Sequence, residues 1–94
     1  MDNNVDRLIN NSWDDAEIID VSYFNNDILK FKIRDYKENI LEFEFNNIFK
    51  LYFEDYLSND ISHIKKEISG DVCKINIFSA STDKKILEFS FFFD

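Results

Sequence analysis

Few residues in this chain have side chains that could perform catalysis. His63 is the single histidine and follows Ser62 directly. Nucleophilic catalysis needs a nucleophile, a base and a third orienting group placed around one another, and two adjacent residues do not supply that arrangement. We interpret His63 as a surface residue at a turn. Cys73, the single cysteine, lies in an alternating apolar stretch, so we expect a buried small hydrophobe rather than a reactive thiolate. No catalytic residue is predicted.

Carboxylates are abundant, but their spacing does not define a metal site. Pairs occur at 14–15, at 42 and 44, and at 54–55. Acid–base catalysis or divalent-ion binding would require such groups to converge in one pocket, whereas the pattern favours a solvated acidic face. One cysteine and one histidine are too few for a zinc site rich in these ligands, and the single glycine, Gly70, excludes a glycine-rich phosphate loop. We expect no enzyme activity, no cofactor and no metal.

Composition and charge limit the class of protein further. The 94 residues are 45% hydrophobic and carry 19 acidic against 11 basic side chains, a net charge of −8. This content is too apolar for disorder, and the sign of the charge argues against direct nucleic-acid binding. The longest apolar runs, 51–53 and 91–93, are far below the ~20 residues of a membrane span, and no signal peptide is readable. We predict one cytoplasmic domain, with a polar leader over 1–12 and a β-rich part over 13–94.

The first half of the chain predicts a three-stranded meander. Residues 18–24, 28–34 and 40–45 alternate apolar and polar side chains and are separated by Asn- and Asp-rich turns. With the turns at these positions, one register pairs apolar side chains on one face of the sheet and polar side chains on the other. The predicted apolar pairs are Tyr23/Leu29, Val21/Phe31, Ile19/Ile33, Leu29/Phe45, Phe31/Phe43 and Ile33/Leu41. The predicted polar pairs on the other face are Ser22/Lys30, Asp20/Lys32, Lys30/Glu44 and Lys32/Glu42.

The second half predicts further strands. Residues 48–53 suggest a fourth strand in which Phe49, Leu51 and Phe53 share a face, and we expect one helical turn at 59–63 followed by a strand. A hairpin at Gly70 and Asp71 would pair Ile68 with Cys73 and Glu67 with Lys74. The last hairpin sets Cys73, Ile75 and Ile77 opposite Phe91, Phe89 and Leu87. The fold class is therefore mainly β, with β-rich α+β as the alternative: an antiparallel meander of about six or seven strands in an open barrel or two-layer sheet, with one or two short helices.

A local cluster precedes the first strand. Trp13, the single tryptophan, stands between the polar leader and the strand, where it can cover the open end of a small core while its indole N–H bonds a carbonyl. Asp14 and Asp15 are expected to form the turn by bonding nearby backbone amides, with their carboxylates exposed.

The same cluster resembles a known family. Trp13, Asp15 and Ala16 match a WHDA-type motif at the entry to a strand, with Asp14 in place of the usual His, and the alternating strands and residues 46–51 add to the likeness. The chain resembles the immunity protein 50 family of bacterial polymorphic toxin systems over about residues 13–91. This resemblance implies a cytosolic antidote that binds and neutralises a cognate toxin, such as a basic nuclease, by forming a stoichiometric complex.

The distribution of charge points to a contact surface for such a partner. Residues 1–20 hold six acidic side chains against Arg7 alone, a net charge of −5. A negative surface would speed association with a basic partner and orient it. The candidate partner-binding residues are Asp14, Asp15, Glu17, Asp20, Glu54 and Asp55. Two alternatives stay open: a β domain that binds a small apolar ligand, and a self-associating module such as a homodimer that uses the Phe92 face or a sheet edge.

Overall fold

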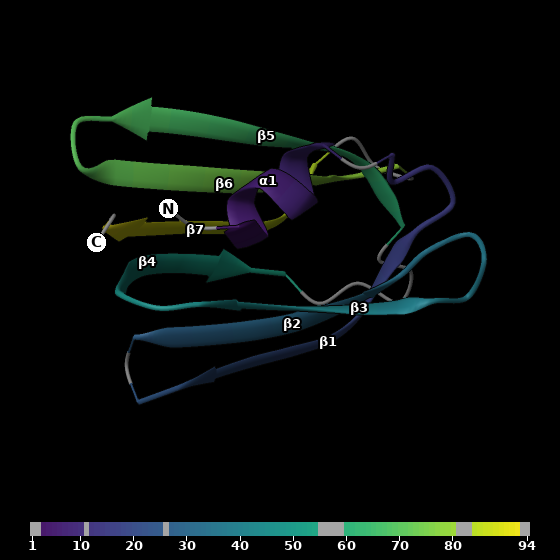
Figure 1. Ribbon diagram of the computed structural model, residues 1–94, viewed down its shortest axis with the longest axis horizontal. Helices are drawn as coiled ribbons and strands as arrows, with labels where there is room; N and C mark the ends of the chain where they lie inside the picture. The colour runs from purple at the N-terminus through teal and green to yellow at the C-terminus, as the bar shows by residue number, and fades with distance from the viewer. Residues whose placement is uncertain (1–2, 11, 26, 55–59, 81–83, 93–94) are drawn as a thin grey trace.

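Over the residues that the structure describes, seven antiparallel strands form two open sheets, with one short helix near the N-terminus (Figure 1). The computed structural model describes residues 3–10, 12–25, 27–54, 60–80 and 84–92. The elements are α1 (Asn3–Asn10), β1 (Glu17–Phe24), β2 (Ile28–Arg34), β3 (Ile40–Phe45), β4 (Ile48–Phe53), β5 (Ile61–Ser69), β6 (Val72–Ser79) and β7 (Lys85–Phe92). One sheet has the order β1-β2-β3 and the other β4-β7-β6-β5. The predicted mainly β antiparallel fold is confirmed.

The register of the three-stranded sheet is largely as predicted. β2 and β3 pair Leu29 with Phe45, Phe31 with Phe43 and Ile33 with Leu41. On the outer face, Lys30 lies 3.3 Å from Glu44 and Lys32 lies 4.0 Å from Glu42. β1 pairs with β2 as predicted from Asp20 to Tyr23. Opposite charges across the strands therefore reinforce the register that the apolar face requires.

Two bulges move side chains from their predicted faces. Between Ile18 and Asp20 the register of β1 shifts, so Ile18 rather than Ile19 pairs with Ile33, and Ile19 is 39% exposed. A second shift in β4 leaves Ile48 buried and Phe49 exposed, which corrects the expected inward position of Phe49. A bulge inserts one unpaired residue into a strand. Because successive side chains of a strand point to opposite faces of the sheet, residues on one side of the bulge then point to the face opposite to the one expected.

The four-stranded sheet contains both predicted hairpins. Ile68 pairs with Cys73 and Glu67 with Lys74 around Gly70, whose φ of +60° suits glycine. β6 and β7 have the predicted partners throughout the apolar face. The predicted helical turn at 59–63 is wrong over the described residues 60–63, because Asp60 bridges Glu17 and β5 begins at Ile61. The spacing of the apolar residues Ile61, Ile64 and Ile68 is compatible with a helix as well as with a strand. The hydrogen-bonded pairing of β5 with β6 favours the strand.

Phenylalanine rings join the two sheets into one core. Phe31, Phe43 and Phe45 stack along the inner face of β2 and β3. Across the sheets, Phe45 lies 4.8 Å from Phe89 and 5.2 Å from Phe91 between ring centroids. All of these rings are almost completely buried.

Helix α1 covers the edges of both sheets, and sequence analysis did not predict it. It packs against β3 and β5, with Val5 and Leu8 buried in the core (Figure 1). The Asn4 side-chain amide donates to the Glu44 carbonyl at 2.7 Å, and the Arg7 guanidinium lies 4.8 Å from the Phe43 ring centroid. Residues 3–10 thus contribute to the packed domain.

Candidate functional site at the acidic loop end

The antiparallel topology sorts the turns into two groups at opposite ends of the molecule. The β1–β2, β3–β4 and β5–β6 turns lie at one end, where Ile48 N–H donates to the Asp27 carbonyl at 3.0 Å (Figure 1). Residues 12–16, the β2–β3 turn, the end of β4 and the start of β5 lie at the other. There, Ile61 N–H donates to the Ala16 carbonyl at 2.8 Å and Ala80 N–H to the Asp60 carbonyl at 2.9 Å.

Carboxylates concentrate at this second end, which we call the acidic loop end. Among the described residues it carries Asp14, Asp15, Glu17, Asp35, Glu38, Glu54 and Asp60. Arg34, Lys37, Lys84 and Lys85 are the described basic residues in the same region. The turns at the opposite end contain only Asp27 and Asp71 among their described carboxylates. Carboxylates are therefore more numerous at the acidic loop end, which with its four basic and seven acidic residues has a net charge of −3 among the described residues.

Trp13 anchors the acidic loop end to the core as predicted. Its side chain is 5% exposed, and its indole N–H donates to the Leu8 carbonyl at 2.6 Å. The ring meets Phe43 edge to face, with centroids 6.0 Å apart. Ala16 N–H donates to the Trp13 carbonyl at 3.1 Å, closing a turn in which Asp15 has a φ of +60°. Asp tolerates this left-handed conformation better than most residues.

Asp14 and Asp15 lie on the surface of that turn. Both are exposed, as predicted, but among the described residues neither carboxylate accepts the expected backbone amide, and the turn is closed by the Ala16 N–H and the Trp13 carbonyl instead. The hydrogen bond described for the Asp14 carboxylate comes from the Ser12 hydroxyl at 3.3 Å, and no ion pair among the described residues involves Asp14. Two negative charges are therefore presented to solvent beside a buried aromatic ring.

The remaining predicted contact residues have different surroundings. Glu17 is half-buried and forms an ion pair with Arg34. Asp20 is exposed on the outer face of the three-stranded sheet opposite Lys32, away from the loops. Glu54 is exposed and accepts a hydrogen bond from the Tyr52 hydroxyl. Asp55 lies outside the described residues. The structure thus places Glu54 at the same end as Asp14, Asp15 and Glu17, with Asp20 on the adjoining sheet face.

Sequence analysis missed three carboxylates of this end because they are distant in sequence. Asp35 accepts backbone hydrogen bonds from Lys37 and Asn39, both at 2.9 Å, and so builds the β2–β3 turn. Glu38 is exposed in that turn with a φ of +65°. Asp60 bridges to Glu17 at the start of β5. Pairing of the strands brings these residues together, a signal visible only once the topology is known.

Two hollows flank Trp13 at this end. One, of about 270 Å³, lies between α1 and β5; its lining residues are Ile9, Ser12, Trp13, Asp14, Ser62, His63 and Ile64. The other, of about 280 Å³, lies beside the β2–β3 turn; its lining residues are Ser12, Trp13, Asp35, Tyr36, Lys37, Asn39 and Leu41. Both combine an apolar wall with a carboxylate.

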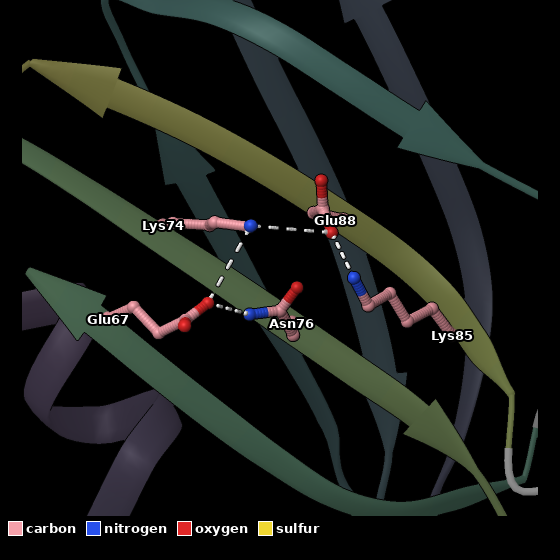
Figure 2. A network of polar contacts seen from close by, with 5 residues as sticks. All are labelled: Glu67, Lys74, Asn76, Lys85 and Glu88. Atoms are coloured by element: carbon pink, nitrogen blue, oxygen red, sulfur yellow. Dashed lines mark hydrogen bonds and ion pairs between the residues drawn. The ribbon is translucent and has the colours of Figure 1, made fainter.

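A charged network occupies the outer face of the four-stranded sheet (Figure 2). Glu88, whose side chain is 13% exposed, contacts Lys85 at 2.6 Å and Lys74 at 3.9 Å. The hydrogen bond from Lys85, with the positive charges of Lys74 and Lys50, holds the pKa of Glu88 below its usual value despite partial burial. Asn76 donates to Glu67 at 3.0 Å. Only its Glu67/Lys74 pair was predicted, and the network combines two basic with two acidic side chains.

The residues considered for catalysis, His63 and Cys73, take part in the packing of the four-stranded sheet. His63 stacks on Phe78 with centroids 4.5 Å apart and is half-buried within β5, which corrects its predicted position at a surface turn. Its Nδ1 lies 3.0 Å from the Ser62 hydroxyl. Cys73 is buried, as predicted. Within the described residues no group of three or more His, Cys, Asp or Glu side chains is placed to hold a metal ion.

No protein family, curated protein or solved structure matched the chain in the three comparisons with known proteins. Among the described residues, no helix has the length and apolar character needed to cross a membrane.

Proposed function

We propose that this protein is a cytoplasmic immunity protein that binds and neutralises a cognate bacterial toxin through the acidic loop end. One observation carries the proposal: seven described carboxylates from separate parts of the chain lie at one end of the sandwich, with Asp14, Asp15 and Glu54 exposed. The resemblance of residues 13–16 to a WHDA-type motif adds support and supplies the class of partner.

Electrostatics favours a basic polypeptide as that partner. A surface of one sign attracts an oppositely charged protein during diffusion and can raise the association rate by roughly 10- to 1,000-fold. Complementary charge also fixes the orientation of docking. A basic nuclease toxin fits these requirements, and the complex would block it by covering its nucleic-acid-binding surface.

Packing and backbone hydrogen bonds fix the described turn at residues 13–16 of the acidic loop end. Trp13 is buried, and backbone hydrogen bonds join Ala16 to Ile61 and Asp60 to Ala80. A surface that is already held in place loses less conformational entropy on association. Anchoring of the turn that carries Asp14 and Asp15 therefore supports a stoichiometric inhibitor.

One observation favours self-association as a second candidate. Phe49 and Phe92 stack with ring centroids 4.5 Å apart and are 50% and 49% exposed. Such an exposed aromatic pair on the outer side of the four-stranded sheet suits a homodimer contact. Native mass spectrometry of the purified chain at micromolar concentration distinguishes a dimer from a monomer.

Co-expression with candidate toxins tests the immunity function. The toxin gene is sought beside the gene for this protein and by pull-down from the source cell with native mass spectrometry. We expect cells to survive the toxin only when the protein is present, and the purified pair to form a stoichiometric complex at micromolar concentration. Equal killing with and without the protein would refute the proposal.

A further inference from the structure

The hollow between α1 and β5, which we call the Trp13 cleft, has a size and lining suited to bind one side chain of another polypeptide. Its volume of about 270 Å³ is just below the roughly 300–1,000 Å³ of pockets for drug-sized ligands. Ile9 and Ile64 are partly buried and pack against the core, and together with Trp13 they supply the apolar lining of the cleft. A single extended side chain with an apolar stem fits such a space.

The rim of the cleft favours a cationic group at the end of that stem. The Asp14 carboxylate lines the cleft, is exposed, and forms no ion pair among the described residues. Ser12 and Ser62 add hydroxyl oxygens, which can accept further hydrogen bonds. Because the surrounding end of the molecule is negative, a positive group would be favoured over an anion or a neutral one.

The second hollow beside Trp13 lacks the feature that matters most. Its carboxylate, Asp35, already accepts the backbone N–H groups of Lys37 and Asn39 at 2.9 Å each. Lys37 also lines that hollow and brings a positive charge of its own. Asp14 accepts a longer hydrogen bond, from the Ser12 hydroxyl at 3.3 Å, so its carboxylate is the more available of the two for an external cation.

We infer that the Trp13 cleft binds an arginine side chain of a polypeptide partner. The methylene stem packs on Ile9, Trp13 and Ile64, and the guanidinium donates to the Asp14 carboxylate. Arginine suits the site better than lysine, since the guanidinium is less strongly hydrated and its planar fork matches a carboxylate. The inference rests on the proposed function for the identity of the partner, a basic toxin, but the cleft can be tested without that toxin.

Titration with Nα-acetylargininamide tests the cleft in the intact protein. We expect saturable changes in NMR amide shifts confined to residues 12–14 and 62–64, with a shift of the Trp13 indole signal. The matching citrulline compound has the same shape without the charge and should bind at least roughly tenfold more weakly, as expected for a lost charge-assisted hydrogen bond. Absence of saturable shifts, or equal binding of the citrulline compound, would overturn the inference.

Two conservative variants locate the interaction. Asp14→Asn should weaken binding of Nα-acetylargininamide by about tenfold or more, because it removes the charge that faces the guanidinium. Asp15→Asn removes an adjacent exposed charge that does not line the cleft, and asparagine accepts the positive φ at this position. It should retain most of the binding. Equal losses in both variants would show general attraction to the acidic loop end and would contradict a specific pocket. Unchanged far-ultraviolet circular dichroism and Trp13 emission verify that both variants fold.

The same variants separate failure of the cleft from failure of the proposed function. If the toxin binds Asp14→Asn as tightly as the original protein, the arginine pocket is refuted while toxin binding stands. If no toxin binds but Nα-acetylargininamide still saturates the cleft, the proposed function fails while the chemistry of the pocket stands.

Discussion

At the scale of single residues, Trp13 connects the helix, the core and the acidic surface. Its N–H satisfies the Leu8 carbonyl, its ring contacts Phe43, and it lines both hollows. We expect Trp13→Phe to lower the free energy of unfolding by about 1–3 kcal/mol, because a buried carbonyl loses its donor. Trp13→Ala should cost about 3–5 kcal/mol. Urea denaturation measures both, with exposed Ser12→Ala as the control. An unchanged stability of Trp13→Ala would refute this structural role.

Glu88 provides a pH-dependent prediction at the same scale. Its lowered pKa means that the ionised carboxylate stabilises the folded state above the unfolded pKa, and that this contribution is lost as pH falls through the lower folded pKa. Glu88→Gln should therefore be less stable than the original protein at pH 7, with a difference that shrinks in acid. Thermal denaturation from pH 7 to pH 3 measures it. Glu67→Gln, at a more exposed member of the network, should change less. A difference independent of pH would contradict this assignment.

At the scale of elements, the strands were predicted correctly where the apolar face and the charged face of the sheet indicate the same register. Lys30 and Lys32 of β2 pair with Glu44 and Glu42 of β3, so the apolar and polar registers of these two strands coincide. The bulges at Ile19 and Phe49 were missed because an inserted residue has no distinctive type. Helix α1 was missed because only three of its eight residues are apolar, and its stability comes from packing Val5 and Leu8 rather than from propensity.

The core between the sheets predicts which phenylalanines control stability. Phe43 is buried and contacts Phe31 and Trp13. We expect Phe43→Ala to cost about 3–5 kcal/mol, enough to unfold much of the population of so small a domain. Phe92→Ala, at a half-exposed ring, is the matched control and should cost far less. Chemical denaturation of both variants provides the measurement. Equal losses would contradict the assignment of the core.

At the scale of the whole molecule, the acidic loop end could be predicted only in part. Asp14, Asp15 and Glu17 are close in sequence, and Glu54 was chosen for its charge. Asp35, Glu38 and Asp60 join them only through the pairing of strands. Local patterns therefore identify the charges, whereas the topology determines that they form one surface.

The different numbers of carboxylates at the two ends make the central claim testable by matched charge reversals. Asp14→Lys with Asp15→Lys changes the net charge as much as Asp27→Lys with Asp71→Lys at the opposite end. Steering by the acidic loop end predicts that the first pair slows association with the toxin by about tenfold or more, while the second pair has a much smaller effect. Dissociation should change less than association in the first pair.

The most direct measurement is the association rate of the toxin complex for these two double variants, taken from about 0.1 M to 1 M salt, over which the Debye length falls from ~10 Å to ~3 Å. We predict that the rate for the original protein falls steeply with salt and that reversal at Asp14 and Asp15 removes most of this dependence. Equal slowing by reversal at either end, or a rate that does not change with salt, would contradict binding through the acidic loop end.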